Sequence, residues 1–460
     1  MNLEQLRKQA KELLKRARAG DDEAVGRLDG REPILANAQL VLAREHGYPS
    51  WPALVTAAEA DVDSFVRAAT DRGGARADEM LAGRPEIERD PWARLVLGHG
   101  WDGDPNRPGG PRNWAPLLYV CHSVYANANL ARELLARGAD PNATFTNEYG
   151  EMSALYGAAG VVHDPELTRV LLEAGANPDD GESVYHSAET EDTECLRLLL
   201  EAGAQTTGTN GLAHALDYDR IEPVRMLLKA GADPNEHAHV AHAVRRGRGP
   251  EFVRLLHEFG ADLDRPGGET WRGDALLRTA YAQAFLRGRE DVARTLEELG
   301  ASTALPPGDA AIAQISRGEQ PTHPLPADLD YDVQEALILA ALRGKVDLVV
   351  DAVGPDFRGV IGGSPGGTLL HHAAWTANAD AARELLARGA DPNAPASTGD
   401  PETPFSWVVW GSAHTPLAGR DYVLVAEALV DGGATLDPRF LDGAAGPLRE
   451  WLQLHLPGEL

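Results

Sequence analysis

The stretch Gly138-Ala-Asp-Pro-Asn142 decides how this sequence is interpreted, because the same five letters return at 231–235 and 389–393. Each copy directly follows a leucine-rich segment. The intervals are regular in the middle of the chain, where phrases begin at residues 175, 203, 231 and 260. A phrase that returns at nearly constant intervals predicts a repeat architecture in which each copy is one structural unit. Altered copies of the phrase begin at Gly175, Gly203, Gly260, Gly300 and Gly433.

Each residue of this phrase has a local physical role. Glycine most readily adopts the left-handed conformation with which many helices end. The proline that follows excludes helical geometry from the residue before it and so favours an extended exit. Upstream of the first copy, Leu130, Leu134 and Leu135 recur with the spacing of one helix face. The phrase therefore predicts the end of a helix followed by a turn.

A second phrase precedes these helices. It reads Ala-Pro-Leu-Leu-Tyr-Val from Ala115, Ser-Ala-Leu-Tyr-Gly-Ala-Ala from Ser153 and Thr-Leu-Leu-His-His-Ala-Ala from Thr368, with weaker forms at 335–344 and 403–405. The two phrases together resemble the ankyrin-repeat family, whose repeat carries T-P-L-H-x-A at the start of its first helix. The resemblance covers about residues 61–438. It implies an all-α solenoid of about ten helix–turn–helix units with helical caps at both ends.

The spacing of the phrases also divides the chain into expected segments. A helical N-terminal cap, which resembles a leader preceding ankyrin arrays in bacterial proteins, is expected first. Two repeat blocks follow, separated by a break in which five prolines between residues 306 and 326 exclude one continuous helix. A C-terminal cap with Leu448, Trp451, Leu452 and Leu454 closes the array. The expected boundaries are 1–60, 61–303, 304–330, 331–437 and 438–460.

Composition narrows the classes of partner. The 460 residues carry 70 Asp+Glu against 43 Lys+Arg, a formal net charge of −27. Such a field repels phosphate backbones and anionic lipid, so neither nucleic acid nor a membrane is the expected partner. No apolar run approaches the roughly 18 residues of a membrane-spanning helix. The two cysteines, Cys121 and Cys195, do not form a disulfide framework. We expect a cytoplasmic protein, and the sequence leaves its oligomeric state open.

The resemblance implies that first helices and the loops before them line a concave surface. Residues after the paired small residues of each first helix are therefore predicted to face outward and to bind a protein partner. Aromatic residues and arginine dominate protein interfaces, and this row contains both. Several of these aromatic side chains could instead pack against neighbouring loops. The predicted partner-binding residues are His122, Glu189, Asp217, Tyr218, Arg245, Arg246, Trp271, Tyr281, Trp375 and Trp410.

Histidines form a second regularity. His186, His214 and His242 occupy the same slot at intervals of 28 residues, and His372 repeats the slot in the second block. Adjacent helices pack about 8–10 Å apart, which predicts a structural ladder of half-buried imidazoles. Binding an extended acidic ligand is the alternative. The helix spacing disfavours a shared zinc ion, and the metal-like run from 237 to 242 (HAHVAH) is also compatible with an ordinary repeat turn. No metal or cofactor is therefore predicted.

The most direct functional hypothesis is a non-catalytic scaffold that binds a protein on its concave surface. The alternative is a hydrolase-like enzyme with a site on the repeat groove, built from His186, His214 and His242 and the carboxylates of Glu189 and Asp217. Convergence of two of these histidines and one carboxylate in a closed pocket would favour the enzyme. The sequence shows none of the motifs that bind nucleotide phosphates, and it favours the partner-binding hypothesis.

Overall fold

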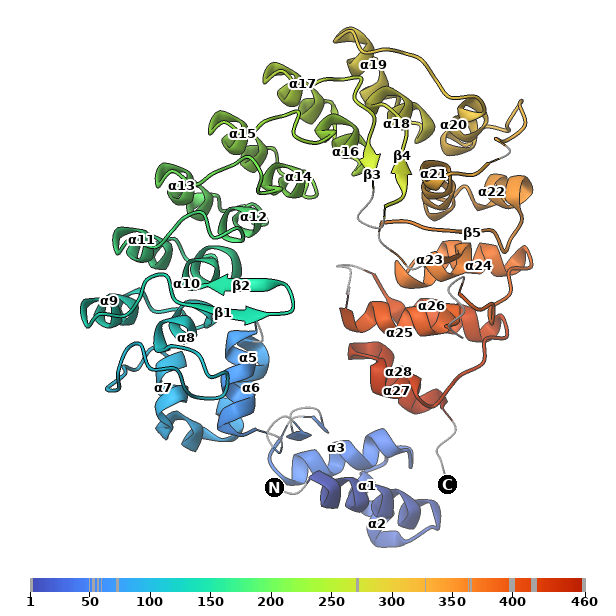
Figure 1. The fold of residues 1–460 in the computed structure, drawn as a ribbon. Helices are drawn as coiled ribbons and strands as arrows, with labels where there is room; N and C mark the ends of the chain where they lie inside the picture. Colours follow the sequence, from blue (N-terminus) through green and yellow to red (C-terminus); the bar gives the residue numbers. More distant parts are fainter. Residues whose placement is uncertain are drawn as a thin grey trace. The chain divides into compact units, whose positions relative to one another are not determined.

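The fold is given by a computed structural model of the chain (Figure 1). The described part of the chain is mainly helical and contains three two-stranded antiparallel hairpins. Its contacts divide it into two compact units, Met1–Glu236 and His237–Leu460. The structure describes residues 3–48, 50–51, 54–55, 58, 60–71, 74–269, 273–326, 328–362, 364, 366–396, 402–414 and 420–456.

The first unit begins with three helices, which occupy the segment predicted to form the N-terminal cap. Helix α1 packs against both of the others. Leu13, Leu28 and Val41, one from each helix, lie in one buried cluster. Asp21 begins the second helix by accepting a hydrogen bond from the Ala24 N–H, which satisfies one of the free donors at the helix start. The three helices are α1 (Leu3–Arg18), α2 (Asp22–Leu28) and α3 (Leu35–Glu45).

The rest of the first unit is a stack of helix pairs, seen in Figure 1 as two parallel rows. Four elements precede the regular pairs: α5 (Val62–Thr70), α6 (Gly74–Gly83), η1 (Pro85–Arg89) and α7 (Pro91–Val96). The first-helix row contains α8 (Pro116–His122), α10 (Ala154–Tyr156) with the π-helical η2 (Gly157–Val161), α12 (Ser183–Ser187) and α14 (Gly211–Ala215). The second-helix row contains α9 (Ala128–Ala136), α11 (Pro165–Glu173), α13 (Glu194–Glu201) and α15 (Ile221–Lys229). Helices pack both within a pair and along each row.

The predicted helix ends are confirmed. All eight glycines of the repeated phrase have positive φ, between 87° and 99°. At the first of them, the Gly138 N–H bonds to the Leu135 carbonyl and the Ala139 N–H bonds to the Leu134 carbonyl, both at 2.9 Å. These bonds satisfy carbonyls that the ending helix leaves free. The leucines just before these glycines are buried between the rows, as Leu134 shows.

The last residue of the phrase joins one repeat to the next. The Asn142 side chain donates to the Gly175 carbonyl at 3.2 Å and accepts from the Asn177 N–H at 2.7 Å. In the second unit, Asn393 makes the same pair of bonds to the Gly433 carbonyl and the Thr435 N–H. We call this arrangement the asparagine staple. It links the turn of one repeat to the helix end of the following repeat.

Antiparallel hairpins extend three loops of the stack. In the first unit, β1 (Thr144–Asn147) pairs with β2 (Gly150–Ser153), with Thr144 opposite Ser153. The turn is held by the Asn147 side chain, which accepts from the Tyr149 N–H at 2.8 Å. Two shorter hairpins in the second unit are β3 (Gly268–Glu269) with β4 (Ala275–Leu276) and β5 (Arg358–Gly359) with β6 (Gly367–Thr368).

The second unit repeats the pairing of helices. Its apolar core is continuous from Leu286 to Leu452. Short first helices again pack against longer second helices, for example α18 against α19 and α23 against α24. The unit contains α16 (His239–Arg245), α17 (Pro250–Glu258), α18 (Ala280–Leu286), α19 (Glu290–Glu298), α20 (Asp309–Arg317), α21 (Tyr331–Leu342), α22 (Val346–Val353), α23 (Leu369–Trp375), α24 (Ala379–Ala387), α25 (Pro404–His414), α26 (Tyr422–Asp431), α27 (Phe440–Gly443) and α28 (Gly446–His455).

The proline-rich segment 304–330 was predicted to separate the two repeat blocks. Helix α20 lies within it and packs against both α18 and α21. A buried ionic network reinforces this packing, because the Arg278 guanidinium bonds to the carboxylates of Asp309 at 2.7 Å and Asp330 at 2.8 Å. The contacts divide the chain into two compact units between residues 236 and 237.

The last helix covers one end of this core. Leu448, Trp451 and Leu452 of α28 are buried against α25 and α26, as the sequence predicted. Leu454, which was assigned to the same cap, is 53% exposed. Among the described residues, no helix combines the length and apolarity needed to cross a membrane.

Candidate functional site

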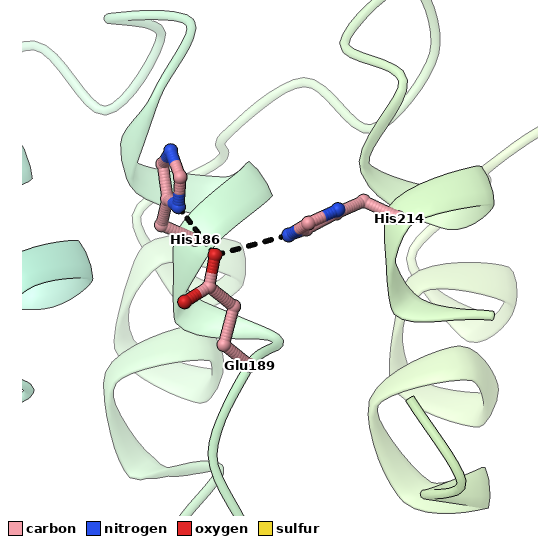
Figure 2. A group of neighbouring side chains, drawn as sticks. All are labelled: His186, Glu189 and His214. Atoms are coloured by element: carbon pink, nitrogen blue, oxygen red, sulfur yellow. Dashed lines mark hydrogen bonds and ion pairs between the residues drawn. The ribbon is translucent and has the colours of Figure 1, made fainter. Parts of the chain in front are cut away.

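Two histidines of the first-helix row converge on one carboxylate. His186 lies on α12 and His214 on α14, while Glu189 lies in the turn that follows α12 (Figure 2). The Glu189 Oε1 atom lies 2.5 Å from the His186 Nδ1 atom and 3.0 Å from the His214 Nε2 atom. The two rings meet edge to face, with centroids 5.8 Å apart. One carboxylate oxygen therefore bridges two successive repeats.

The remaining ring nitrogens also face carboxylates. The His186 Nε2 atom lies 3.3 Å from Glu182 Oε2, and the His214 Nδ1 atom lies 3.6 Å from Asp217 Oδ2. All of these side chains are half-buried. Each imidazole is thus flanked on both sides by acidic groups, so this surface does not suit the extended acidic ligand considered from the sequence.

Electrostatics follow from this arrangement. Partial burial disfavours the charged form of Glu189, but the hydrogen bonds from His186 and His214 outweigh it and lower the pKa of that carboxyl well below its usual range. For His214, burial acts to lower the pKa, but the neighbouring Asp217 and Glu189 raise it above the usual histidine value. The carboxylate charge and the proton on His214 stabilise each other.

The histidines belong to a continuous ladder of aromatic rings. The Tyr185 ring stacks on His214 at 3.7 Å with an interplanar angle of 11°. Tyr218 meets the other side of His214 at 5.3 Å, edge to face. Towards the N-terminus, Tyr156 contacts His186 at 5.2 Å. These side chains come from three successive first helices and the turns after them.

The ladder continues through the preceding repeat. Tyr156 contacts His122 at 5.8 Å, and His122 contacts Trp114 at 5.4 Å. Phe145 of the hairpin strand β1 stacks on Trp114 at 4.0 Å. An unbroken series of ring contacts therefore runs along the first-helix row from Trp114 to Tyr218. We call it the aromatic ladder.

A hollow of about 550 Å³ opens beside this ladder. One wall is the β1–β2 hairpin, whose tip residue Tyr149 is 81% exposed. The opposite wall includes Tyr156, Tyr185 and His186. A concave, largely aromatic depression with a few polar groups is the form that ligand and peptide sites commonly take. Its lining is Asn147, Tyr149, Met152, Tyr156, Gly181, Glu182, Tyr185, His186 and Thr209.

The predicted partner-binding residues of the first unit differ in burial and in their neighbours. Glu189, Asp217 and Tyr218 are half-buried and lie together around His214. His122 was predicted to face outward, but it is only 3% exposed and its Nε2 atom bonds to the Ser153 carbonyl at 3.0 Å. The outward orientation is wrong for His122, because the β1–β2 hairpin and its neighbours cover the ring.

In the second unit, only some of the predicted partner-binding residues are exposed. Arg246 is exposed, whereas Arg245 is half-buried and its Nη1 atom lies 3.9 Å from Glu335 Oε1. Tyr281 was predicted to face outward but is 7% exposed, because it packs beneath α19 with its hydroxyl bonded to Glu297. Trp271 lies outside the described residues.

Two tryptophans of the row form an aromatic patch in the second unit. Trp410 of α25 is 47% exposed and stacks on His414 with centroids 4.7 Å apart. Trp375 is half-buried and meets Trp410 at 5.5 Å, edge to face. These two residues come from α23 and α25, which pack against each other.

Histidines at this position of the repeat differ in burial and in hydrogen-bond partners along the chain. His372 repeats the slot in α23 but is buried, with its Nε2 atom bonded to the Gly359 carbonyl at 3.0 Å. Burial lowers the pKa of His372 to about 4. His242 is half-buried on α16 of the second unit. The structural ladder expected from spacing alone is replaced, at His186 and His214, by bridging through Glu189.

Among the described residues, His186, Glu189 and His214 are the one group of three His, Cys, Asp or Glu whose donor atoms lie within 4.8 Å of one another. From the sequence, the helix spacing disfavoured a zinc ion shared between these histidines. The distance between helix axes does not take account of the Glu189 carboxylate, which reaches between the two rings. The aromatic residues Tyr149, Tyr156 and Tyr185 were missed as well, although a tyrosine directly before His186 was a readable signal.

The same geometry bears on the hydrolase alternative. Two histidines and a carboxylate do converge, but the hollow beside them is open rather than closed. All four ring nitrogens face carboxylates at 2.5–3.6 Å, so none is directed towards a substrate proton. A general base must reach the proton that it abstracts. The arrangement therefore gives the hydrolase alternative no support.

Comparison with known proteins agrees with the repeats seen in the fold. The family model for ankyrin repeats (three copies) matches residues 152–238, and the model for a single ankyrin repeat matches residues 366–397. The human ASB11 ankyrin repeat domain is 19% identical, covers 52% of this chain and 99% of its own, and gives a TM-score of 0.35. The ankyrin repeat domain of Bcl-3, a member of the IkappaB family, is 21% identical, covers 51% and 97%, and gives 0.32. No curated protein matches the chain.

Proposed function

Since this chain carries ankyrin repeats, which are in general protein-interaction modules, we propose that it is a non-catalytic scaffold that binds a protein partner. The contact surface is the aromatic ladder of the first unit together with the hollow beside it. The partner lies along the first-helix row and inserts a side chain between the β1–β2 hairpin and Tyr185. The predicted residues Glu189, Asp217 and Tyr218 lie on this surface.

One observation carries this proposal: the aromatic ladder is continuous and borders a hollow of about 550 Å³. Tyrosines contribute large contact areas at low cost in side-chain entropy and are enriched at interface hot spots. Tyr156, Tyr185 and Tyr218 are half-buried, so their rings are already fixed before a partner binds. A pre-ordered surface loses little conformational freedom on association.

Charge indicates the chemistry of the partner. Glu182, Glu189 and Asp217 lie at the ladder, and the whole chain has a net charge of −27. Complementary charge steers association and excludes partners of the wrong sign. A segment that presents lysine or arginine beside apolar residues fits this surface, since arginine also packs favourably on aromatic faces.

We propose the patch of Trp375 and Trp410 in the second unit as a separate protein-contact surface. Trp410 is among the large apolar side chains that remain exposed, and exposed tryptophans beside a second aromatic ring are typical anchors of protein interfaces. Arg246, which is exposed, belongs to the same proposed row in this unit. His122 and Tyr281 are buried and do not belong to the proposed contact surfaces.

The proposal is tested by capture of partners from an extract of the source cells, quantified by mass spectrometry. The immobilised wild-type chain is compared with a Tyr149→Ala/Tyr185→Ala double variant and with Trp410→Ala. We expect at least about a tenfold loss of captured partner on the double variant, which corresponds to roughly 1.4 kcal/mol. Capture should also weaken as salt concentration rises, because the proposed partner segment is basic.

Leu424→Ala is the matched control, since Leu424 is an exposed apolar residue on α26 outside the proposed surfaces. It should capture the same proteins as the wild type. Thermal unfolding of all variants is measured in parallel, because loss of stability would also reduce capture. Unchanged capture by a stable double variant would show that the aromatic ladder is not the binding surface.

A further inference from the structure

We propose that His186, Glu189 and His214 form a binding site for one divalent transition-metal ion, with zinc as the ion that suits the donors best. Two imidazole nitrogens and one carboxylate oxygen are a donor set that zinc takes in proteins. Figure 2 shows both rings directed at the same carboxylate from neighbouring helices. His186 and Glu189 also lie on the proposed contact surface, but metal binding can be tested without the partner.

The distances between donor atoms favour this assignment. Zinc bonds to these donors at about 2.0–2.2 Å, which places the ligand atoms of a tetrahedral ion roughly 3.3 Å apart. Glu189 Oε1 lies 2.5 Å from His186 Nδ1 and 3.0 Å from His214 Nε2, and all three donor atoms lie within 4.8 Å of one another. Small rotations of the three side chains bring them to the spacing that the ion requires.

The groups around the donors provide a second, independent indication. Histidines that bind metal usually direct their other ring nitrogen at a carboxylate, which fixes the tautomer and the orientation of the ring. Both histidines have this partner: Glu182 lies 3.3 Å from His186 Nε2, and Asp217 lies 3.6 Å from His214 Nδ1. His214 Nδ1 is also buried and without a hydrogen bond within the usual limit, so a small shift towards Asp217 would satisfy it.

Charge balance points the same way. Three carboxylates, Glu182, Glu189 and Asp217, surround two imidazoles that are neutral when they bind metal. A divalent cation at the centre offsets most of this negative charge. Arg220 is the nearby cation, but its guanidinium bonds to the backbone carbonyl of Glu189 rather than to the carboxylate. That bond holds the turn in which Glu189 lies.

A metal ion at this position links two repeats. His186 and Glu189 belong to one repeat and His214 to the next, so the ion would cross-link α12 to α14 through bonds stronger than the present hydrogen bonds. Three protein ligands also leave one position of a tetrahedral ion for water or another donor. Adding zinc should therefore raise the thermal stability of the chain. The site should hold a single ion with nitrogen and oxygen ligands and no sulfur ligand.

The decisive experiment is calorimetric titration of zinc chloride into the full-length chain after treatment with a chelator. We expect one ion per chain at this site in the wild type. Binding there should be lost in His186→Gln and His214→Gln, which keep a polar side chain of similar reach. Glu182→Gln and Asp217→Asn should weaken it by about 10- to 100-fold, as is usual when the partner of a ligating histidine is removed. His257→Ala, which removes an exposed histidine of α17, should bind like the wild type.

X-ray absorption at the zinc edge provides a readout that does not depend on variants. The expected spectrum shows two imidazole nitrogens with oxygen in the remaining positions. Retention of full-affinity zinc binding by the His186→Gln/His214→Gln double variant overturns the proposal, as does loss of binding in His239→Gln/His242→Gln alone. The proposal is also overturned if the wild-type chain binds zinc no more tightly than the His186→Gln/His214→Gln variant. The three side chains then form a hydrogen-bonded bridge only.

Discussion

At the scale of single residues, one slot of the repeat gives two kinds of histidine. His214 is half-buried among carboxylates, and its pKa is raised by Asp217 and Glu189 after burial has acted in the opposite direction. His372 occupies the same slot but is enclosed by protein, with Trp407 at 5.4 Å and a backbone carbonyl as its hydrogen-bond partner. Its pKa falls to about 4 because burial penalises the charged ring. Position in the repeat therefore does not determine the chemistry of the side chain.

A pH dependence of stability follows for the second unit. Burial lowers the pKa of both His371 and His372 from 6.5 to about 4, so the unfolded chain binds their protons more tightly than the folded chain does. The stabilisation is complete above pH 6.5 and is lost as pH falls from about 6.5 towards 4. The full shift corresponds to roughly 3 kcal/mol for each histidine.

Urea unfolding followed at several pH values measures this effect. The free energy of unfolding should fall steadily between about pH 6.5 and pH 4, and a His372→Gln variant should show a shallower decline. His257→Gln is the control, because that side chain is exposed on α17. A decline of equal slope in the wild type and His372→Gln would assign the pH dependence to other groups.

At the scale of the element, the repeated five-residue phrase does more than end a helix. Glycine terminates each helix through positive φ, as the sequence predicted. The asparagine staple adds bonds between repeats, which could not be predicted because the partner atoms lie 33 and 35 residues further along the chain. Where aspartate replaces asparagine, only the acceptor half remains, as in Asp264, which accepts from the Ser302 N–H at 2.8 Å.

Removal of one staple should therefore weaken the contact between two repeats. Asn142→Ala loses both bonds to the next repeat, and we expect the free energy of unfolding to fall by about 1–2 kcal/mol. Asn142→Asp retains the acceptor and should lose less. Chemical unfolding of the two variants gives the comparison, with Asn129→Ala on α9 as an exposed control in the same repeat. Equal stability of Asn142→Ala and the wild type would mean that water replaces the staple without cost.

Local signals in the sequence were sufficient for the repeats but not for the site. Helix ends are encoded by neighbouring residues, so the positions of Gly138 and its seven equivalents predicted them correctly. Helix α20 was missed because the prolines were counted together, although they lie on either side of Asp309–Arg317 rather than within it. The bridge through Glu189 depends on side-chain rotamers across two repeats. No periodicity in the sequence reports on those.

At the scale of the whole molecule, stability is distributed along each stack. A helix such as α11 packs against its partner and against α9 and α13, with no single centre on which every repeat depends. In a solenoid of this kind, folding free energy is approximately a sum of repeat and nearest-neighbour terms. A substitution that destabilises one repeat should therefore affect mainly that repeat and its neighbours.

Leu171→Ala tests this expectation, because Leu171 is fully buried on α11. Truncation of a buried leucine costs about 2–5 kcal/mol. Amide hydrogen exchange should show loss of protection in α9, α11 and α13, while α26 and α28 of the second unit keep theirs. Faster exchange throughout the chain would instead indicate that it unfolds as one cooperative body.

The β1–β2 hairpin has a consequence for how recognition can diversify. It is inserted into the loop between two helix pairs, and its tip carries Tyr149 beside the hollow, whereas Phe145 and Ser153 nearer its base contact the stack. Loops of this kind accept changes in length and sequence at small thermodynamic cost. The tip of the hairpin can therefore change under selection for a new partner while its base and the helices remain unchanged. In this molecule, new specificity can arise most readily at the exposed hairpin tip, because the rest of the contact surface also forms the stack.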